Sequence, residues 1–548
     1  MKLRQSSLFV SSCAFAMSSL ASAATYYVSP AGDDNNAGTQ SAPWKTFAKA
    51  QAMAVADDTI YFRGGAYVFT AGLNSCASMT DTVNVITLNK SGQAGKPIRY
   101  WAYPGETPVF DFSQMQDNCR VKGFNVVASY LHLKGLEVTG APQHPGNYLN
   151  NESWGIWING SNNIFEYLNT HHHMGPGLFL SDGSNNLILN VDSHHNFDPY
   201  SKSGPGQNAD GFGAHVKANR PGNVFRGCRA WSNTDDGYDT INAGSQIIIE
   251  NSWAWLHGYY PGTTTPIAAG NGNGIKLGGF GGGYAANAPQ HIARFNVAFN
   301  NKAAGFYANH HPVASFFYNN TGVANHYNFN MLGVDPSGAA INLGILRNNL
   351  SYLGTAVTNM AGTDNAYNSW NLPVSVTAAD FQGVSTQGWD APRLPDGSLP
   401  PMPNFRLVSG SDLVDAGIDV GLPFTGAAPD LGAYEGTTPV VSFADVTSSV
   451  KIMQSGLTLD RATQKMSGTV TFTNMSNAVI SGNLQFRADY LTSGVTLDNR
   501  TGMQGGAPML SVPKASLAPG ETVTVTTVFA NPGRVSVGYT PKLLAGSF

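Results

Sequence analysis

A short repeat with fixed columns constrains the fold of this chain more than any other feature of its sequence. The segments NTHHH, DSHHN, RAWSN, WAWLH, VAFNN and TGVAN recur between residues 169 and 325 and align without gaps. In each segment the third residue is the large one of the repeat, mostly aromatic or His. The residue before it is small, and the last residue is polar. The middle column comprises His171, His194, Trp231, Trp255, Phe299 and Val323, and the polar column comprises His173, Asn196, Asn233, His257, Asn301 and Asn325.

A second column, of glycines, begins the next part of each unit. It lies in GLFL, GFGA, GYDT, GIKL and GFYA, at Gly177, Gly211, Gly237, Gly274 and Gly305. A unit can be as short as the 23 residues from His171 to His194, which cannot bury a core alone. Stacked as coils with strands about 4.8 Å apart, such units bury a continuous core, and stacked Asn side chains satisfy one another along the axis. We therefore expect an all-β chain built as a right-handed parallel β-helix.

The character of the chain changes beyond this repeat. The β-helix is expected to occupy residues 24–437, ending at the segment APDLGAYEG. Near its start, APWKTFAKAQAMAVADD is the main helix candidate, with Pro43 near the beginning of the segment. Residues 438–548 contain alternating segments such as GTVTFTN and TVTVTTVFAN without the Asn column, which predicts a C-terminal antiparallel β-sandwich of Ig-like type. Its role is open between a carbohydrate-binding module and a domain that only aids secretion or stability.

The first residues have the pattern of an export signal. Lys2 and Arg4 precede a short apolar run, and the ASA segment at 21–23 has the small-x-small pattern of a signal-peptidase site. We predict that residues 1–23 are a signal peptide and that the protein is secreted to the extracellular space, with a periplasmic location as the alternative. A lipoprotein signal at Cys13 is a weaker alternative, because the apolar stretch before it is very short.

Charge and cysteine content bear on partners and redox state. Only 12% of the residues are charged and the net charge is -4, without a run of Lys or Arg, which argues against nucleic acid as a partner. No later segment is long and apolar enough for a membrane span. We expect a monomer with neither nucleic acid nor a membrane as partner. Export permits a disulfide, and Cys76–Cys119 is the expected pair, which leaves Cys228 as a buried free thiol.

The segment SNTDDGYDTI, residues 232–241, gathers carboxylates in a chain that uses charge sparingly. Asp236, like Asp210, immediately precedes a glycine of the second column, so the two aspartates should stack on adjacent coils, with Asp235 beside them. Asp239 lies two residues beyond its glycine, and Lys276 occupies the same place on the next coil. We expect these side chains to converge within about two rungs of the stack, roughly 5 to 10 Å.

Four carboxylates this close cannot all ionise comfortably without a cation. Because the cluster offers only oxygen ligands, a hard ion is expected, and Ca²⁺ tolerates irregular shells better than Mg²⁺. The alternative is that Asp235 and Asp236 merely form an Asx turn, although stacked acids from separate coils should then repel each other. We predict a Ca²⁺ site made by Asp210, Asp235, Asp236 and Asp239.

Two long insertions are expected to flank this cluster. The step from the polar column to the next glycine is 4 residues in several coils, but 15 residues from Asn196 to Gly211 and 17 from His257 to Gly274. The insertions FDPYSKSGPGQNA and GYYPGTTTPIAAGNG leave the stack at the same turn, so they should wall a cleft with the acids on its floor. Long loops on a rigid scaffold are where function tends to reside.

The segments NADGFGAHV, NVFRGCRAWSNTDDGYD, ENSWAW and GNGNGIKLGG resemble the pectate lyases of polysaccharide lyase family 9. The resemblance covers most of the β-helix, including YYVSPAGDDNNAGTQSAPWKTFAKA, but not residues 438–548. It implies that the four aspartates bind Ca²⁺ and that Lys276 is the Brønsted base. It also implies β-elimination on an acidic polysaccharide, with homogalacturonan (pectate) as substrate and 4,5-unsaturated oligogalacturonides as products.

The residue types suit this chemistry. β-Elimination on a uronate removes the proton at C5, next to the carboxylate, and expels the glycosidic oxygen at C4. Ca²⁺ at the acidic cluster would help to bind that carboxylate and would acidify the proton. A lysine base must be neutral, so the pKa of Lys276 has to fall from its ordinary value of about 10.4, which predicts an alkaline optimum.

Two other functions stay open on the sequence alone. A glycoside hydrolase of the polygalacturonase type could use Asp210 and the Asp235-Asp236 pair as its acid and base, although the chain lacks a Gly-His-Gly segment typical of such enzymes. A non-catalytic glycan-binding protein or adhesin could use the acids as a structural Ca²⁺ site, and Lys276 would then be dispensable. Calcium dependence and an unsaturated product would separate the lyase from both.

Overall fold

The computed structural model describes residues 23–70, 81–115, 119–144, 151–394, 396–437, 444–461, 463–481, 483–504, 507–514 and 516–546. Residues 1–22 of the predicted signal peptide, and Cys76 of the predicted disulfide, lie outside these ranges, so both assignments stay predictions. Within the described ranges, no helix combines the length and the apolar character that crossing a bilayer requires.

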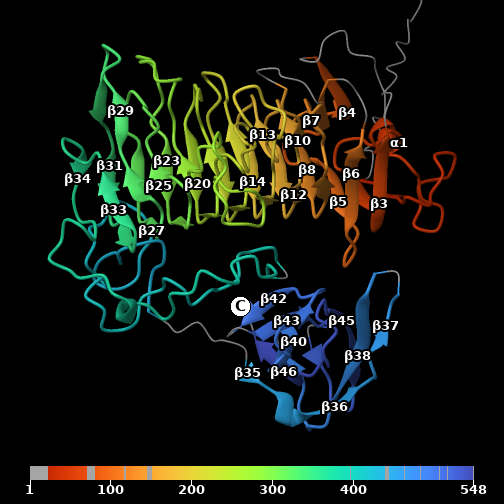
Figure 1. The fold of residues 1–548 in the computed structure, drawn as a ribbon. Helices are drawn as coiled ribbons and strands as arrows, with labels where there is room; N and C mark the ends of the chain where they lie inside the picture. Colours follow the sequence, from red (N-terminus) through yellow and green to blue (C-terminus); the bar gives the residue numbers. More distant parts are fainter. Residues whose placement is uncertain are drawn as a thin grey trace, which may run out of the picture.

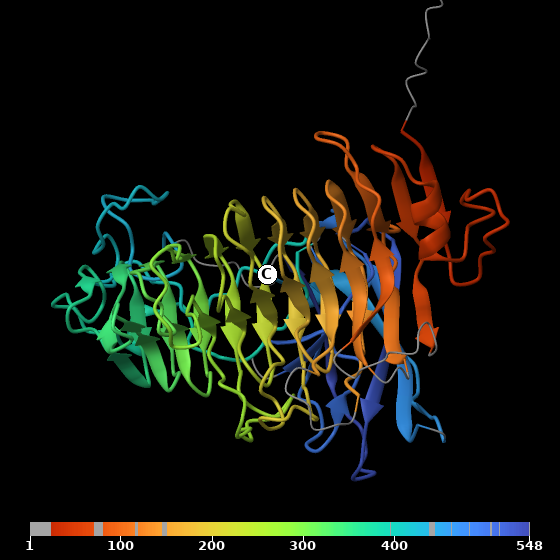
Figure 2. The same ribbon diagram turned by 90° about the horizontal axis from the view of Figure 1, so that it is seen from above.

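Three long parallel sheets form the walls of a stack of coils, and each coil adds one strand to each sheet in turn (Figures 1 and 2). Sheet 1 comprises β1 (Thr25–Val28), β2 (Thr59–Phe62), β5 (Ile98–Ala102), β8 (Leu131–Lys134), β11 (Ile164–Glu166), β14 (Leu187–Leu189), β17 (Asn223–Arg226), β20 (Ile247–Glu250), β23 (Ile292–Arg294), β26 (Phe316–Tyr318), β31 (Ile345–Arg347) and β34 (Asp364–Asn365). Sheet 2 comprises β3 (Gly65–Thr70), β6 (Pro108–Gln114), β9 (Glu137–Thr139), β12 (Asn169–His171), β15 (Asp192–His194), β18 (Arg229–Trp231), β21 (Trp253–Trp255), β24 (Val297–Phe299), β27 (Thr321–Val323) and β32 (Leu350–Tyr352). Sheet 3 comprises β4 (Thr82–Leu88), β7 (Arg120–Val126), β10 (Trp154–Ile158), β13 (Leu178–Leu180), β16 (Phe212–Ala214), β19 (Tyr238–Asp239), β22 (Ile275–Lys276), β25 (Ala304–Tyr307), β28 (Tyr327–Asn330) and β33 (Thr355–Thr358). The predicted parallel β-helix is confirmed.

The register of sheet 2 confirms the columns of the repeat. Trp231 pairs with His194 on one side and with Trp255 on the other, and its ring lies 4.0 and 5.0 Å from theirs. In the polar column, each backbone N–H from His173 to Asn301 donates to the column's side chain on the next coil, as from His173 to Asn196 Oδ1 at 3.0 Å. This ladder satisfies the backbone where the chain turns out of sheet 2. A second ladder, between sheets 1 and 2, was not identified from the sequence and includes Asn296, Asn320, Asn349 and Asn368.

An aromatic and aliphatic core fills the inside of the stack. Helix α1 (Phe47–Met53) covers its N-terminal end, and the Thr46 hydroxyl caps the helix by accepting from the N–H of Lys49 at 3.1 Å. Phe47 is buried, and its ring lies 4.6 Å from that of Phe62. The predicted helix is therefore confirmed, over 7 residues. Cys228 is a buried free thiol in the same core, as predicted.

After β34 the chain turns back along the stack. Residues 366–437, called the outer segment below, contain the 3-10 turn η1 (Ala378–Asp380) and add no strand to the three sheets in their described part. The segment packs on the outer face of sheet 2, where the ring of Trp389 lies 4.4 Å from Trp253 and 4.8 Å from Phe299. Hydrophobic burial against the aromatic column thus holds a segment that has little regular structure of its own.

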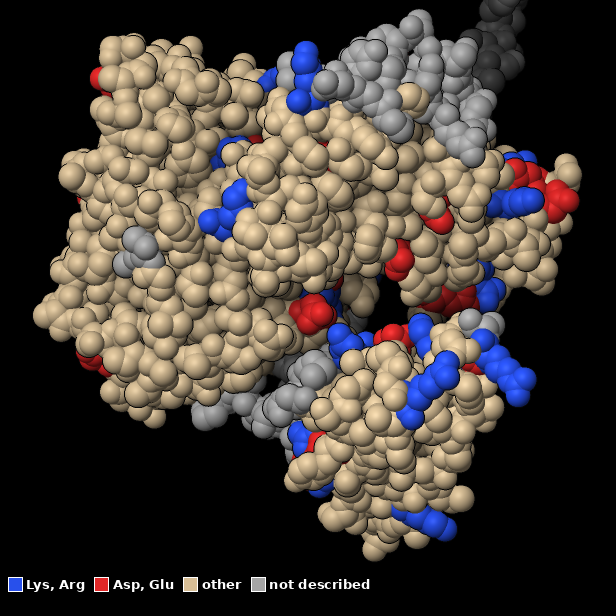
Figure 3. Space-filling view, viewed as in Figure 1, with Lys and Arg blue, Asp and Glu red and all other residues tan. Residues whose placement is uncertain are grey.

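The C-terminal residues form antiparallel sheets with a core of their own, and the predicted sandwich is confirmed. Figure 3 shows few charged side chains on the face that it presents, and a hollow between the β-helix and this domain. One sheet comprises β35 (Ala444–Asp445), β46 (Thr540–Gly546), β40 (Asn483–Asp489), β43 (Ala507–Ser511) and β42 (Gly502–Gln504). The other comprises β36 (Val450–Gln454), β38 (Lys465–Asn474), β45 (Thr522–Ala530) and β41 (Thr496–Leu497), with β37 (Thr458–Leu459) beside β38. The remaining elements are β39 (Ile480–Ser481) with β44 (Ser516–Leu517), η2 (Thr447–Ser449), and on the β-helix the hairpin β29 (Leu332–Val334) with β30 (Ala340–Asn342).

Candidate active site

The predicted acidic residues lie where the chain turns from sheet 2 into sheet 3. Asp210, Asp236 and Asn273 occupy the same position of this turn on successive coils, and they form a ladder of the kind that the Asn columns make. The N–H of Asp236 donates to Asp210 Oδ1 at 3.1 Å. The backbone N–H and the Nδ2 amide of Asn273 donate to Asp236 Oδ1 at 2.7 and 2.9 Å. The backbone of the stack therefore fixes the positions of these carboxylates.

Asp239 and Lys276 lie side by side on sheet 3, one rung apart. They pair in register between β19 and β22, which is the juxtaposition expected from the repeat. Lys276 Nζ lies 3.0 Å from Asp239 Oδ2 and 3.0 Å from Asp236 Oδ2. The lysine is only 7% exposed, so the two carboxylates replace the water that would otherwise solvate its charge.

Three of the four aspartates form a group that could hold a metal ion. One carboxylate oxygen from each of Asp210, Asp236 and Asp239 lies within 4.8 Å of the other two. Asp235 is buried next to this group, where its Oδ1 accepts from the N–H of Asn271 at 2.6 Å. The donor set consists of oxygen atoms alone, and such a set fits a hard cation such as Ca²⁺.

The electrostatics of the cluster depend on what neutralises it. Burial raises the pKa of Asp210 well above its ordinary value, and the charges of Asp239 and Asp236 raise it further. The pKa of Asp235 is raised in the same way, by burial and then by Asp236 and Asp210. Burial alone would lower the pKa of Lys276, but the surrounding carboxylates outweigh it and raise that pKa well above 10.5. Without a cation, the cluster therefore retains protons and keeps the lysine charged.

The two long insertions flank the acidic turn and contact each other. The ring of Phe197 in the first lies 5.8 Å from that of Tyr260 in the second. Lys302, from the following coil, donates from Nζ to the carbonyl oxygens of Ile267 and Gly270 at 2.5 and 2.6 Å. The second insertion is thus tied to the stack, and the cleft expected between the two insertions stays a prediction.

Two further residues belong to the site and were not identified from the sequence. Asn273 follows the insertion and immediately precedes Gly274, the position that Asp210 and Asp236 occupy on their coils, so this shared position was a usable signal. His215 lies beyond β16, with its ring 4.7 Å from Phe179, and the structure gives its Nε2 no hydrogen-bond partner among the described residues. Burial lowers the pKa of His215, while the charge of Asp239 acts against that shift. No column of the repeat contains His215, so only the fold places it here.

The comparisons with known proteins agree with this geometry. A family model described as "Pel9A-like, right handed beta helix region" matches residues 26–349. Pectate lyase L of Dickeya chrysanthemi is 35% identical over 419 residues, which cover 75% of this chain and 90% of that protein. Pectate lyase PEL9 of Emericella nidulans is 32% identical over 313 residues, covering 53% of this chain and 70% of that protein.

Two solved structures share both fold and sequence with this chain. A rhamnogalacturonan lyase superposes with a TM-score of 0.65 at 36% identity, covering 70% of this chain and 96% of that one. Pectate lyase Pel9A superposes with a TM-score of 0.63 at 34% identity, covering 75% of this chain and 96% of that one. The resemblance to polysaccharide lyase family 9 is confirmed, as is the right-handed coil. The chain is a polysaccharide lyase and belongs to the Pel9A-like family of right-handed β-helix proteins.

Proposed function

We propose that this protein is a secreted, calcium-dependent pectate lyase that cleaves polygalacturonate by β-elimination. It acts as a monomer, with residues 24–437 as the catalytic domain and Lys276 as the base. The observation that carries the proposal is the rung that sets Lys276 within 3.0 Å of both Asp236 and Asp239. The pectate lyases among its relatives support the choice of substrate, and the signal-peptide pattern of residues 1–23 supports export.

The residues present fit a calcium ion. Asp210, Asp236 and Asp239 would hold it, and the adjacent Asp235 would complete the acidic shell. When bound, Ca²⁺ attracts the uronate carboxylate of the substrate and makes the neighbouring C5 proton more acidic. The buried backbone donors behind Asp210 and Asp236 hold these carboxylates in place, so that little reorganisation is needed on binding.

Lys276 is the residue that removes the proton. Its Nζ must first lose its own proton, which the surrounding carboxylates oppose for as long as their charge is not compensated. Once that charge is compensated, burial favours the neutral amine. The neutral Nζ then accepts the C5 proton, a double bond forms between C4 and C5, and the C4–O4 bond breaks. The departing O4 leaves as a hydroxyl of the neighbouring sugar after it takes up a proton from water. The requirement for a neutral lysine predicts an alkaline optimum.

The test is the ultraviolet absorbance of the unsaturated ends formed from polygalacturonate, measured with added Ca²⁺ and with a chelator. We expect product only with Ca²⁺, and a loss of roughly 10²- to 10⁴-fold in kcat for Lys276→Ala. The matched control is Lys276→Arg, which keeps a positive charge among the acids but cannot be deprotonated. Full activity of Lys276→Arg would exclude the lysine as base.

Other results would select other functions. New reducing ends without unsaturated ends would indicate the hydrolase, and binding without cleavage would indicate the glycan-binding protein. Because one of the matched structures is a rhamnogalacturonan lyase, the backbone of rhamnogalacturonan is the second substrate to compare. A higher kcat/KM on that polymer than on polygalacturonate would change the substrate assignment and leave the lyase chemistry intact.

A further inference from the structure

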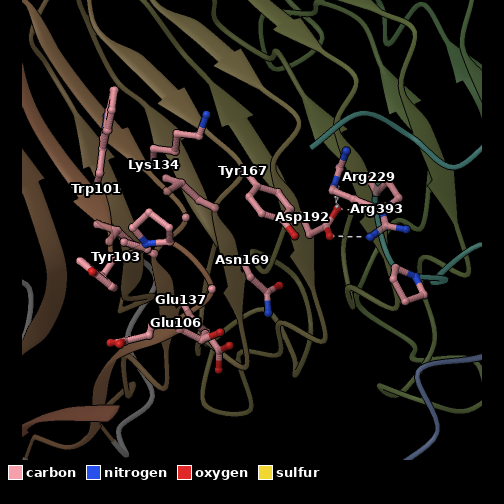
Figure 4. Close-up of a pocket in the computed structure, with 18 of the residues that line it drawn as sticks. Trp101, Tyr103, Glu106, Lys134, Glu137, Tyr167, Asn169, Asp192, Arg229 and Arg393 are labelled. Atoms are coloured by element: carbon pink, nitrogen blue, oxygen red, sulfur yellow. Dashed lines mark hydrogen bonds and ion pairs between the residues drawn. The ribbon is translucent and has the colours of Figure 1, made fainter. Parts of the chain in front are cut away.

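A cleft of about 910 Å³ lies at a different edge of the stack from the acidic cluster. Its walls come from the turns between sheets 1 and 2 and from the outer segment near Asp390 and Arg393. Figure 4 shows Trp101 and Tyr103 at one end of this cleft, the Asp192–Arg393 pair at the other, and Tyr167 between them. Its lining includes no member of the acidic cluster and not Lys276, so it is a separate site.

Aromatic side chains line the first half of the cleft. Trp101 and Tyr61 pair in register, with their rings 6.3 Å apart, and both line it. Tyr103 is held in place by the guanidinium of Arg63, 4.7 Å from its ring centre, and by Gln40, which donates to its hydroxyl at 3.0 Å. Rings that are fixed and partly exposed bind flat apolar faces without a large loss of side-chain entropy.

Tyr167 presents its ring from a strained backbone. It follows β11 with a φ of 53°, in the left-handed region that bulky residues rarely adopt. The corresponding position is Gly135 on the preceding coil and Asn190 and Gly227 on the two following coils, and these residues also have a positive φ. The tyrosine is nevertheless 43% exposed, so burial of its ring offsets the strain only in part. A strained residue that exposes an aromatic ring is a candidate for ligand binding.

The register sets the spacing of the rings. Trp101 pairs with Lys134, and Lys134 pairs with Glu166, the residue before Tyr167. Trp101 and Tyr167 are therefore two rungs apart, or about 10 Å along the stack. That spacing is of the order of two linked sugar rings.

Most of the charged groups that line the cleft are already paired. Glu106 binds the guanidinium of Arg63 at 2.6 Å, and Lys134 binds Glu166 at 2.6 Å. Asp192 lies between two arginines, Arg229 and Arg393, each at 2.6 Å.

The remaining acids make the site unsuited to an anionic chain. Glu137 lies 3.2 Å from His171 Nε2, and Asp390 is exposed at the rim. The lining thus holds four acids, Glu106, Glu137, Asp192 and Asp390, against three bases, Lys134, Arg229 and Arg393. A uronate chain would bring further negative charge to this site without gaining a free cation, whereas an uncharged sugar would meet no such penalty.

We propose that this cleft is a non-catalytic binding site for a neutral polysaccharide, a chain of β-linked hexopyranoses that stacks on Trp101 and Tyr167. Polar groups at the wall, such as Asn169, whose Oδ1 lies 3.0 Å from His194 Nε2, are placed to hydrogen-bond sugar hydroxyls. The volume suits an oligosaccharide segment. The site would hold the enzyme on neutral polymer while the acidic cluster works on another chain. The proposal does not rest on the catalytic assignment.

The test is affinity electrophoresis of the full chain in gels that contain β-1,4-galactan, hydroxyethyl cellulose or polygalacturonate, all with a chelator present. We expect retardation by at least one of the two neutral polymers and none by polygalacturonate. Tyr167→Ala and Trp101→Ala should each weaken the neutral binding about tenfold. Lys276→Ala should bind the neutral polymer like the wild type, so a failure of the catalytic proposal would not affect this result.

Tyr367→Ala is the matched control. Tyr367 has a φ of 56° and is 40% exposed, and both values are close to those of Tyr167. Unlike Tyr167, it does not line the cleft. Its substitution should leave the neutral binding unchanged, and thermal unfolding would show that all variants are folded. The proposal is overturned if neither neutral polymer retards the wild type, or if Tyr167→Ala and Tyr367→Ala behave alike. It is also overturned if polygalacturonate retards the chain through Tyr167.

Discussion

The buried pair of arginines around Asp192 should decide whether the outer segment stays on the β-helix. Arg393 belongs to that segment and is 1% exposed at its side chain. Its guanidinium donates to Asp192 Oδ1 at 2.6 Å and to the carbonyl oxygen of Gly227 at 2.9 Å. Arg229, from the β-helix, binds the other carboxylate oxygen and donates to the carbonyl of Trp389 at 3.0 Å. The network thus joins the segment to two coils.

The pKa of Asp192 gives the size of this interaction. Burial alone would raise that pKa, but the charges of Arg229 and Arg393 lower it from 3.8 to about 2. A difference of this size corresponds to about 2 kcal/mol of stabilisation. Because the folded-state pKa is the lower one, the contribution is fully present above pH 3.8 and is lost as the pH falls through about 2.

We expect Arg393→Ala to cost about 3 kcal/mol, because it leaves a buried carboxylate with one of its two partners and also opens a cavity. The assay is amide hydrogen exchange of the outer segment, followed by mass spectrometry of its peptides. A loss of about 3 kcal/mol should speed local exchange by roughly 10²-fold. Arg347→Ala is the control, since its partner Asp364 is 60% exposed and the pair should contribute less than about 1 kcal/mol. Equal protection in the two variants would refute the reasoning.

Three further predictions concern the acidic site, the ladder and the strained turn. Calcium affinity should fall as the pH is lowered, because the pKa values of Asp210 and Asp236 are raised when no metal is bound. Binding should therefore release protons. Calorimetry in two buffers of different ionisation enthalpy would measure how many are released. Asn301→Ala should cost about 3 kcal/mol in urea unfolding, since it leaves the N–H of His257 without its partner and removes the side-chain hydrogen bonds to Ala254 and Asn325. Tyr167→Gly should raise stability by about 0.5–1 kcal/mol, because glycine adopts the left-handed turn without strain; an unchanged or lower thermal midpoint would contradict this.

The repeat columns carried most of the structure that could be read from the sequence. Because like residues stack on like in a parallel β-helix, aligning Asp239 with Lys276 was equivalent to predicting their contact, and the register confirms it. Asp210 and Asp236 were placed by the same rule, and the hydrogen bond between them follows it. Asn273 occupies the same position as these aspartates on the next coil, but an uncharged amide does not stand out in the sequence as a member of an acidic site.

The rest of the structure depends on contacts that no periodicity encodes. The outer segment, with Trp389 and Arg393, is held by burial against sheet 2 and by the Asp192 network, both of which join residues far apart in the sequence. His215 reaches the active site from a position that no column describes. The exposed ring of Tyr167 could not be predicted from the sequence either, since its backbone angle and its exposure are properties of the folded turn.

In the proposed mechanism, the protonation of Lys276 is coupled to the charge of the surrounding aspartates. Lys276 is buried, which favours its neutral form, but Asp236 and Asp239 are 3.0 Å away and favour its charged form. The two influences oppose each other, and the carboxylates prevail for as long as their charge is not compensated. Any cation held by Asp210, Asp236 and Asp239 offsets that charge, so it must lower the pKa of Lys276 at the same time. On this proposal, removing calcium should keep Lys276 protonated as well as weaken substrate binding, and raising the substrate concentration should not restore the reaction rate.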